Sequence, residues 1–291
     1  MALAVSVSVS AGVRLLIDGE RASCPTSEFY GHAAVLRAFA GVGKPLPVRG
    51  RLQHGWTPTF SGLIWDDSVA KRGGYWAWSA AVVDRLRDAG CDSVQAIGAP
   101  FLYLPPLPPV VEARGLLAVP THSIKRASMR GPGWSQWAAK VSTEAHAAGH
   151  RSWAVLLRPE DAGEAEVLAA HGFEVIAGKP LEDPGCLSFV RDALATHAEV
   201  VSDRPCTALF YAAHLGRAAR IVGPALKSDR PDTSEACTGD PAWVAAQFPG
   251  YVVTPQHAAV ELGAEWVRSA TDLREMLWGY AAARGAREAV R

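Results

Sequence analysis

Short apolar runs alternate with longer segments of helical periodicity along most of this chain. Apolar side chains that recur every three or four residues predict helices, whereas short runs rich in aliphatic residues predict strands. Beyond residue 110 the alternation is regular. It predicts strands at 115–120, 152–157, 173–177, 199–202 and 219–223, and helices at 134–148, 163–171, 186–196, 206–215 and 258–283. This order is typical of parallel sheets with helices packed on their faces.

The first half of the chain shows the same kinds of pattern less regularly. Residues 1–16 alternate Val and Ser and lack a basic segment, so they predict a first strand and not an export signal. Helices are expected at 27–39 and 75–89, and strands at 50–54, 62–65 and 94–97. Between Leu104 and Val110 there are four prolines, which predict a stiff connector. We therefore expect an N-terminal domain over 1–108 and a C-terminal domain over 109–291.

Composition excludes several classes of protein. Hydrophobic residues make up 49% of the 291 residues and charged residues 20%, so the chain can bury a substantial core. The 29 basic and 29 acidic residues cancel, so no overall charge would hold the protein on nucleic acid or on an anionic membrane. No segment of the sequence has the roughly 20 apolar residues that a membrane span needs. Five scattered cysteines without Cys-x-x-Cys spacing favour a reducing, cytoplasmic location over a disulfide framework or a structural zinc site.

Candidate chemistry lies where predicted strands end, because parallel sheets bind ligands beyond the carboxyl ends of their strands. His54 ends the strand at 50–54 and precedes Gly55. An imidazole in this place can act as a general base, and the glycine permits a substrate to approach closely. The alternative is an imidazole in an ordinary solvated turn.

Hydroxyls, an imidazole and two cations follow the first predicted strand of the second half. Thr121, His122 and Ser123 stand directly after this strand, and Lys125 and Arg126 come shortly after them. Such a set can hold a phosphate group. The alternative is a turn rich in Ser and Thr without any ligand.

Two further strand ends carry polar residues. Ser202 and Arg204 lie in the turn before the helix at 206–215, and Thr207 lies in its first turn, where the helix dipole favours an anion. Helix capping is the alternative for this group. Glu160 follows another predicted strand, where a carboxylate can accept a hydrogen bond from a ribose hydroxyl or cap the next helix.

Four strings of residues carry a resemblance to a known family. They are His54-Gly-Trp, Ile97-Gly-Ala-Pro-Phe-Leu-Tyr-Leu, Pro120-Thr-His-Ser and Thr207-Ala-Leu-Phe-Tyr-Ala-Ala-His-Leu-Gly-Arg. In this order they resemble bacterial surface-polysaccharide glycosyltransferases of GT-B architecture, over roughly residues 50–224. The resemblance implies an α/β fold of two Rossmann-like domains with a cleft between them, in which the N-terminal domain is reduced.

The resemblance also implies roles for the candidate residues. His54 would take the proton of an acceptor hydroxyl. The groups that would surround the donor's phosphate are Thr121, His122, Ser123, Ser202 and Thr207. The cations that would neutralise the leaving nucleotide are Lys125, Arg126 or Arg204. Neither a metal ion nor another cofactor is expected in such a reaction, because phosphate stabilisation by the protein takes its place.

The sequence therefore predicts an enzyme, a metal-independent glycosyltransferase that moves a sugar from a nucleotide-sugar donor to a hydroxyl-bearing acceptor. Its product would be a surface glycan or a glycosylated natural product. Two alternatives stay open because a fold does not determine a reaction. One is a sugar-nucleotide isomerase or hydrolase on the same scaffold, and the other is a non-catalytic module that binds a nucleotide or a glycan.

Overall fold

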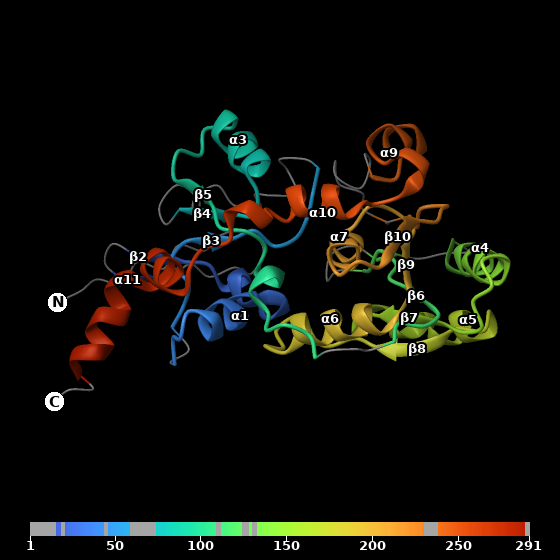
Figure 1. The fold of residues 1–291 in the computed structure, drawn as a ribbon, viewed down its shortest axis with the longest axis horizontal. Helices are drawn as coiled ribbons and strands as arrows, with labels where there is room; N and C mark the ends of the chain where they lie inside the picture. The colour runs from blue at the N-terminus through green and yellow to red at the C-terminus, as the bar shows by residue number, and fades with distance from the viewer. Residues whose placement is uncertain are drawn as a thin grey trace.

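The structure is a computed structural model that describes residues 16–18, 21–43, 46–58, 74–108, 112–123, 128–129, 133–227, 229 and 238–288. Some predicted features lie outside these residues, namely the strand at 62–65, all but the end of the strand at 1–16, and Lys125 and Arg126. The described residues form an α/β fold with a five-stranded and a three-stranded parallel sheet (Figure 1). A short antiparallel ribbon precedes both sheets and consists of β1 (Leu16–Asp18) and β2 (Arg21–Ser23).

The larger sheet belongs to the second half of the chain. Its strands are β6 (Leu116–Ala118), β7 (Trp153–Leu157), β8 (Glu174–Ala177), β9 (Glu199–Ser202) and β10 (Ala218–Ile221). They pair in parallel in the order β10-β9-β6-β7-β8. Numbered along the chain and read from β8, this is the 3-2-1-4-5 order of Rossmann folds. The strands predicted beyond residue 110 are confirmed, and their bounds differ from the prediction by about two residues at most.

Helices cover both faces of this sheet, as is usual for parallel strands. They are α4 (Gly133–Ala147), α5 (Ala165–Ala170), α6 (Cys186–Thr196) and α7 (Thr207–His214). Side chains of α4 and α5 pack on one face, and those of α6 and α7 pack on the other. The strand residues divide by alternation, since Leu116 and Ala118 contact the first pair of helices and Leu117 contacts the second.

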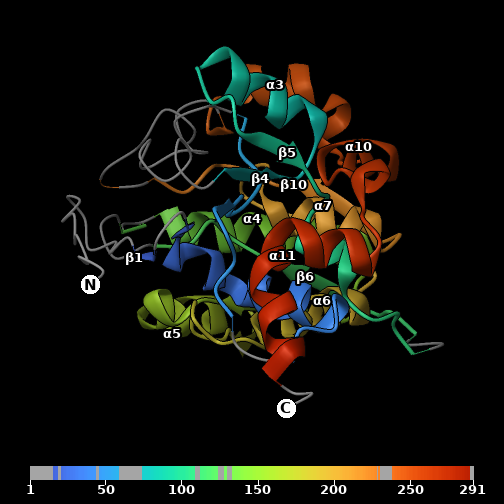
Figure 2. The same cartoon turned by 90° about the vertical axis from the view of Figure 1, so that its left-hand side faces the viewer.

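The smaller sheet belongs to the first half. Its strands are β3 (Arg51–Leu52), β4 (Tyr75–Ala77) and β5 (Val94–Ala96), which pair in parallel in chain order. The helices on it are α3 (Ala80–Asp88), α1 (His32–Phe39) and the terminal α11 (Ala270–Glu288). Helix α3 packs on one face, and α1 and α11 pack on the other (Figure 2). Leu273, Leu277 and Trp278 of α11 are buried in the core of this sheet.

The helix predicted at 75–89 is wrong in its first part. Tyr75–Ala77 forms strand β4, and α3 begins only at Ala80. All three residues of β4 are buried, with Tyr75 1% exposed. A strand that is buried on both faces is a continuous apolar run, which periodicity alone cannot distinguish from a segment of buried helix.

The helix predicted at 27–39 consists of two elements. A 3-10 helix, η1 (Pro25–Gly31), ends where Tyr30 and Gly31 adopt positive φ angles of 57° and 74°, and α1 follows directly. Gly31 packs against the backbone of Pro184, where a Cβ atom would stand 2.3 Å from the carbonyl oxygen. The break therefore depends on a contact with a distant segment, which local periodicity does not reveal.

The long helix predicted at 258–283 is also interrupted. The C-terminal segment contains α9 (Pro241–Gln247), η4 (Pro249–Tyr251), α10 (Pro255–Glu261), η5 (Ala264–Trp266) and α11. Gly263 separates α10 from η5 with a φ of 68°, and a Cβ atom there would stand 1.8 Å from the carbonyl oxygen of Trp78. Two further 3-10 helices are η2 (Pro100–Tyr103) and η3 (Pro159–Glu164).

The two sheets contribute to one hydrophobic cluster. Trp78, Ala99 and Phe101 come from the first half of the chain and pack with Tyr211 of α7. The rings of Phe101 and Tyr211 stack with centroids 4.0 Å apart. The expected division of the chain at residue 108 stays a prediction. Among the described residues, no helix has the length and apolar character needed to cross a membrane.

Candidate functional site

The loop that follows β3 reaches across to helix α7 of the other sheet. Gln53 fixes the loop, because its side-chain amide donates to the carbonyl of Gly55 and its oxygen accepts from the Trp78 backbone nitrogen at 2.8 Å. The backbone nitrogen of Trp56 donates to Oγ1 of Thr207 at 2.9 Å. A Cβ atom on Gly55 would stand 3.1 Å from the same hydroxyl oxygen, so glycine permits this close approach. Two predicted site residues, His54 and Thr207, are thereby brought into one region.

His54 lies among aromatic rings of the η1 segment. Its ring centroid is 5.6 Å from that of Phe29 and 4.8 Å from that of Tyr30. Burial lowers the pKa of His54 to about 3, and the positive charges of neighbours such as Arg51 and Arg158 add to this effect. The imidazole is therefore neutral near pH 7 and has a nitrogen lone pair that can accept a proton.

Tyr30 connects this region to the loop that follows β6. Its hydroxyl lies 3.4 Å from Nε2 of His122, whose Nδ1 is 2.9 Å from the carbonyl oxygen of Ser123. A carbonyl can only accept, so we infer that Nδ1 carries the proton and that Nε2 accepts from the Tyr30 hydroxyl. Burial lowers the pKa of His122 and raises the pKa of Tyr30 to about 12. Both groups are neutral near pH 7 and form a polar link between η1, on the smaller sheet, and the loop after β6 of the larger sheet.

Buried carboxylates hold the loop after β6 to the segments that follow β9 and β7. The backbone nitrogen of Thr121 donates to Asp203 at 2.6 Å, and that of Ser123 donates to Asp161 at 2.8 Å. Strands β6 and β9 are neighbours whose following helices, α4 and α7, lie on opposite faces of the sheet. This is the topological switch point at which parallel sheets bind ligands. The buried Oγ1 of Thr121 has no hydrogen-bond partner within the described part of the chain.

Three predicted residues make contacts within the protein that bear on their proposed roles. Arg204 is 5% exposed and donates from Nε to Asp203 and from a terminal nitrogen to the carbonyl of Leu226, so its charge is already compensated. Ser202 is fully buried, and its hydroxyl lowers the pKa of the Cys206 thiol, which burial raises more strongly. Glu160 forms an ion pair with Arg158 at 3.3 Å. Lys125 and Arg126 lie outside the described residues.

Sequence reasoning missed three residues at this site. The guanidinium of Arg158 lies 5.3 Å from the ring centroid of Tyr30, and the buried hydroxyl of Tyr211 has no hydrogen-bond partner among the described residues. Arg158 directly follows β7, so the strand-end rule that selected Glu160 could have selected it as well. Tyr211 lies within the helix predicted at 206–215, where an aromatic side chain is an ordinary core residue and gives no signal of a site. No local signal indicates Tyr30, because its position depends on the break between η1 and α1.

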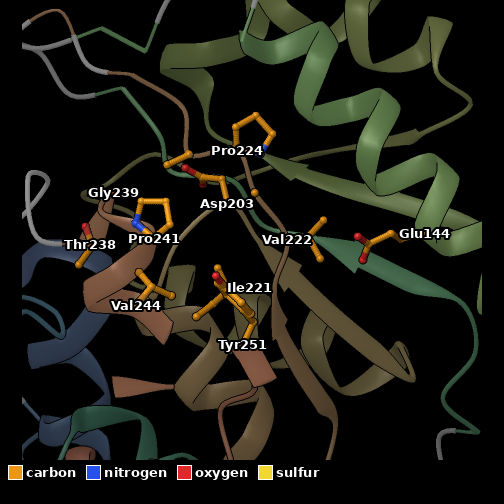
Figure 3. A pocket seen from close by; sticks show the side chains of 12 residues that line it. Glu144, Asp203, Ile221, Val222, Pro224, Thr238, Gly239, Pro241, Val244 and Tyr251 are labelled. Atoms are coloured by element: carbon orange, nitrogen blue, oxygen red, sulfur yellow. The ribbon is translucent and has the colours of Figure 1, made fainter. Parts of the chain in front are cut away.

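A cavity of about 290 Å³ lies beside the edge strand β10 (Figure 3). Its lining comprises Glu144, Asp203, Ile221, Val222, Gly223, Pro224, Ala225, Thr238, Gly239, Pro241, Val244 and Tyr251. Asp203 thus stands between this cavity and the switch point, since it also binds the backbone of Thr121. No pattern in the sequence predicts the cavity, because the segment from 238 to 251 completes it by folding back beside β10, where Val252 bridges to Arg220.

Metal-ligating and thiol groups are dispersed in this structure. Within the described part of the chain, no cluster of three or more His, Cys, Asp or Glu side chains could hold a metal ion. Within the described residues, Cys24, Cys91, Cys186 and Cys206 are not in disulfide bonds. In comparisons with known proteins, no family model matches this sequence and no curated protein is significantly similar to it.

Proposed function

We propose that this protein is a glycosyltransferase that moves a sugar from a nucleotide-sugar donor to a hydroxyl-bearing acceptor. The observation that carries this proposal is the contact between the His54 loop and the switch point of the larger sheet. There the Trp56 nitrogen binds Thr207 at the start of α7, and Tyr30 bridges His54 to His122. A neutral imidazole and a row of hydroxyl groups thus come together where a Rossmann-like sheet binds its ligands.

In the proposed reaction, the bond between the sugar and the donor's phosphate breaks and a new bond forms to the acceptor oxygen. His54 accepts the proton of the acceptor hydroxyl, and the nucleotide leaves with the electron pair of the broken bond. The hydroxyls of Thr121 and Thr207, together with the N-terminal dipole of α7, stabilise the charge on the leaving phosphate. A bound diphosphate also places negative charge near His54, which raises the pKa of the imidazole and strengthens it as a base.

The finer architecture belongs to this proposal. We infer that the two sheets are the cores of two GT-B domains that divide near residue 108, with the donor against the larger sheet and the acceptor against the smaller one. The product would be a surface glycan or a glycosylated natural product, made in the cytoplasm. Arg204 is not needed for the leaving group, because its charge is paired with Asp203.

Nucleotide binding is the first test. Calorimetric titration with nucleoside mono- and diphosphates should show binding of at least one of them to the wild-type protein. Failure of all of them to bind would contradict a nucleotide-sugar donor and leave the glycan-binding module as the surviving alternative.

Acceptor dependence and a His54 variant test the reaction. Nucleotide release from the donor should require the acceptor, whereas a hydrolase would release it with water alone. His54→Ala should lower turnover by roughly 10²- to 10⁴-fold and leave donor affinity nearly unchanged, as expected for the loss of a general base. His171→Ala is the matched control, because His171 binds Ser135 on the other side of the larger sheet. Equal losses of turnover and donor affinity in His54→Ala would refute its role as the base.

A further inference from the structure

Arg158 places a positive charge beside the polar link between the two sheets. It directly follows β7, its side chain is 13% exposed, and its guanidinium lies over the ring of Tyr30 at 5.3 Å. The charge acts on the neighbouring groups, since it helps to lower the pKa values of His54 and His122 and offsets part of the rise in the pKa of Tyr30. This guanidinium is therefore part of the same buried environment as the predicted base.

The hydrogen bonding of Arg158 is incomplete within the described part of the chain. A guanidinium has five N–H donors. The ion pair with Glu160 is 3.3 Å long, a terminal nitrogen donates to the same carboxylate at 3.5 Å, and the buried Nε makes no hydrogen bond of acceptable geometry. Arg220 differs, because its Nε donates to Glu199 and a terminal nitrogen donates to Glu144 at 3.3 Å.

The ion pair between Glu160 and Arg158 can break when an anion binds to Arg158 more strongly than Glu160 does. Its side chain is 29% exposed, so the carboxylate can turn into solvent at small cost. A partly exposed ion pair with contacts of 3.3 and 3.5 Å contributes little to stability, whereas a bidentate contact between a guanidinium and a phosphate is strong. An anion at Arg158 would also lie near Tyr30 and His122, because Arg158 lies over the ring of Tyr30 and the hydroxyl of Tyr30 is 3.4 Å from Nε2 of His122.

We propose that Arg158 is the cation of an anion subsite that takes a phosphate or diphosphate group at the carboxyl end of β7, with Glu160 as its counterion when the subsite is empty. The identification of this anion as the phosphate of a sugar donor rests on the function proposed above. The subsite itself rests only on the position and incomplete bonding of Arg158. In this proposal Arg158 has the role that the resemblance implied for Lys125, Arg126 or Arg204.

Inorganic pyrophosphate is the probe for this subsite. Calorimetric titration at low ionic strength should show binding to the wild-type protein, and Arg158→Gln should weaken it about ten- to a hundredfold, as expected for the loss of a charged hydrogen-bond donor. Glu160→Gln should strengthen binding, because it removes the competing carboxylate. Arg191→Gln is the matched control, since Arg191 pairs with Asp192 on α6 and should leave the affinity unchanged.

Two results would overturn the subsite. One is an absence of pyrophosphate binding to the wild-type protein, and the other is equal affinity in the wild type and Arg158→Gln. If Arg158→Gln does not fold, as judged by thermal unfolding, then Arg158→Lys and Glu160→Gln replace it. Lysine keeps the charge without the paired donors and should bind with intermediate affinity, and weaker binding by Glu160→Gln would contradict the counterion role. The subsite can fail while acceptor-dependent nucleotide release still supports the transferase, so the two proposals are tested separately.

Discussion

Acidification from pH 7.5 to 5 should destabilise the folded protein through its buried histidines. His32 is 2% exposed, and burial lowers its pKa from about 6.5 to about 3; the pKa of His54 is lowered to about 3 as well. Between pH 6.5 and 3 the unfolded chain therefore binds protons at these histidines that the folded protein does not bind. The contribution of these histidines to the free energy of unfolding is therefore complete above pH 6.5 and decreases as the pH falls below this value.

The size of the effect follows from the two pKa values. The loss at pH 5 amounts to about 2 kcal/mol for each histidine, and its slope approaches about 1.4 kcal/mol per pH unit. His32 and His54 together should thus cost about 4 kcal/mol, which is a large part of the stability of an ordinary domain. The carboxylates with lowered pKa values, Asp183 and Glu199, titrate below this range and affect stability only at lower pH.

Urea unfolding followed by tryptophan fluorescence at several pH values measures this loss, because the chain has 10 tryptophans. His32→Phe should reduce the dependence of the unfolding free energy on pH by about 2 kcal/mol between pH 7.5 and 5. His146→Gln, at an exposed position of α4, is the matched control. If His32→Phe and the wild type lose equal stability on acidification, the assumption that His32 stays neutral in the folded protein is wrong.

Three substitutions test other features of the structure. Gly263→Ala should destabilise the protein by more than about 2 kcal/mol in thermal or urea unfolding, because its Cβ atom would collide with a carbonyl oxygen. Gly90→Ala is the control, since Gly90 has a positive φ but open space around it, and should cost about 1 kcal/mol. Comparable losses in both would show that the collision is relieved. Thr207→Val should remove the hydroxyl that accepts from the Trp56 nitrogen and lower the free energy of unfolding in urea by about 1 kcal/mol. Thr207→Ser keeps the hydroxyl and should keep this stability, so equal losses in both variants would argue against the hydrogen bond. Tyr211→Phe should leave the free energy of unfolding unchanged or raise it by about 1 kcal/mol in the same assay, since it removes a buried hydroxyl that has no partner among the described residues. A clear loss of stability would show that the hydroxyl has a hydrogen-bond partner.

The sequence was sufficient for the larger sheet because its strands and helices are clearly separated by length and composition. Its first four strands along the chain are short runs rich in apolar residues, each followed by a helical segment, and both features are local. In the smaller sheet, only two residues separate strand β4 (Tyr75–Ala77) from helix α3. Periodicity therefore placed the start of the helix too early. The breaks at Gly31 and Gly263 result from contacts with distant backbone segments, which no local pattern contains.

The candidate site could be predicted only as a set of strand ends. The rule for parallel sheets selected Thr121, Ser202 and Thr207, and the structure places all three around the switch point. Whether a selected side chain has spare hydrogen-bonding capacity depends on its tertiary partners. Nε of Arg204 donates to Asp203, whereas the buried Nε of Arg158 has no hydrogen-bond partner among the described residues, and this contrast is visible only in three dimensions.

The packing of α11 on the smaller sheet has a consequence for synthesis on the ribosome. The side chains that complete this core, Leu273, Leu277 and Trp278, are translated long after β5 has left the exit tunnel. All strands and covering helices of the larger sheet are translated well before that point. The larger sheet can therefore fold first during translation. The smaller sheet is completed only when α11 has been translated, and a chain truncated before residue 270 would leave one face of this sheet uncovered.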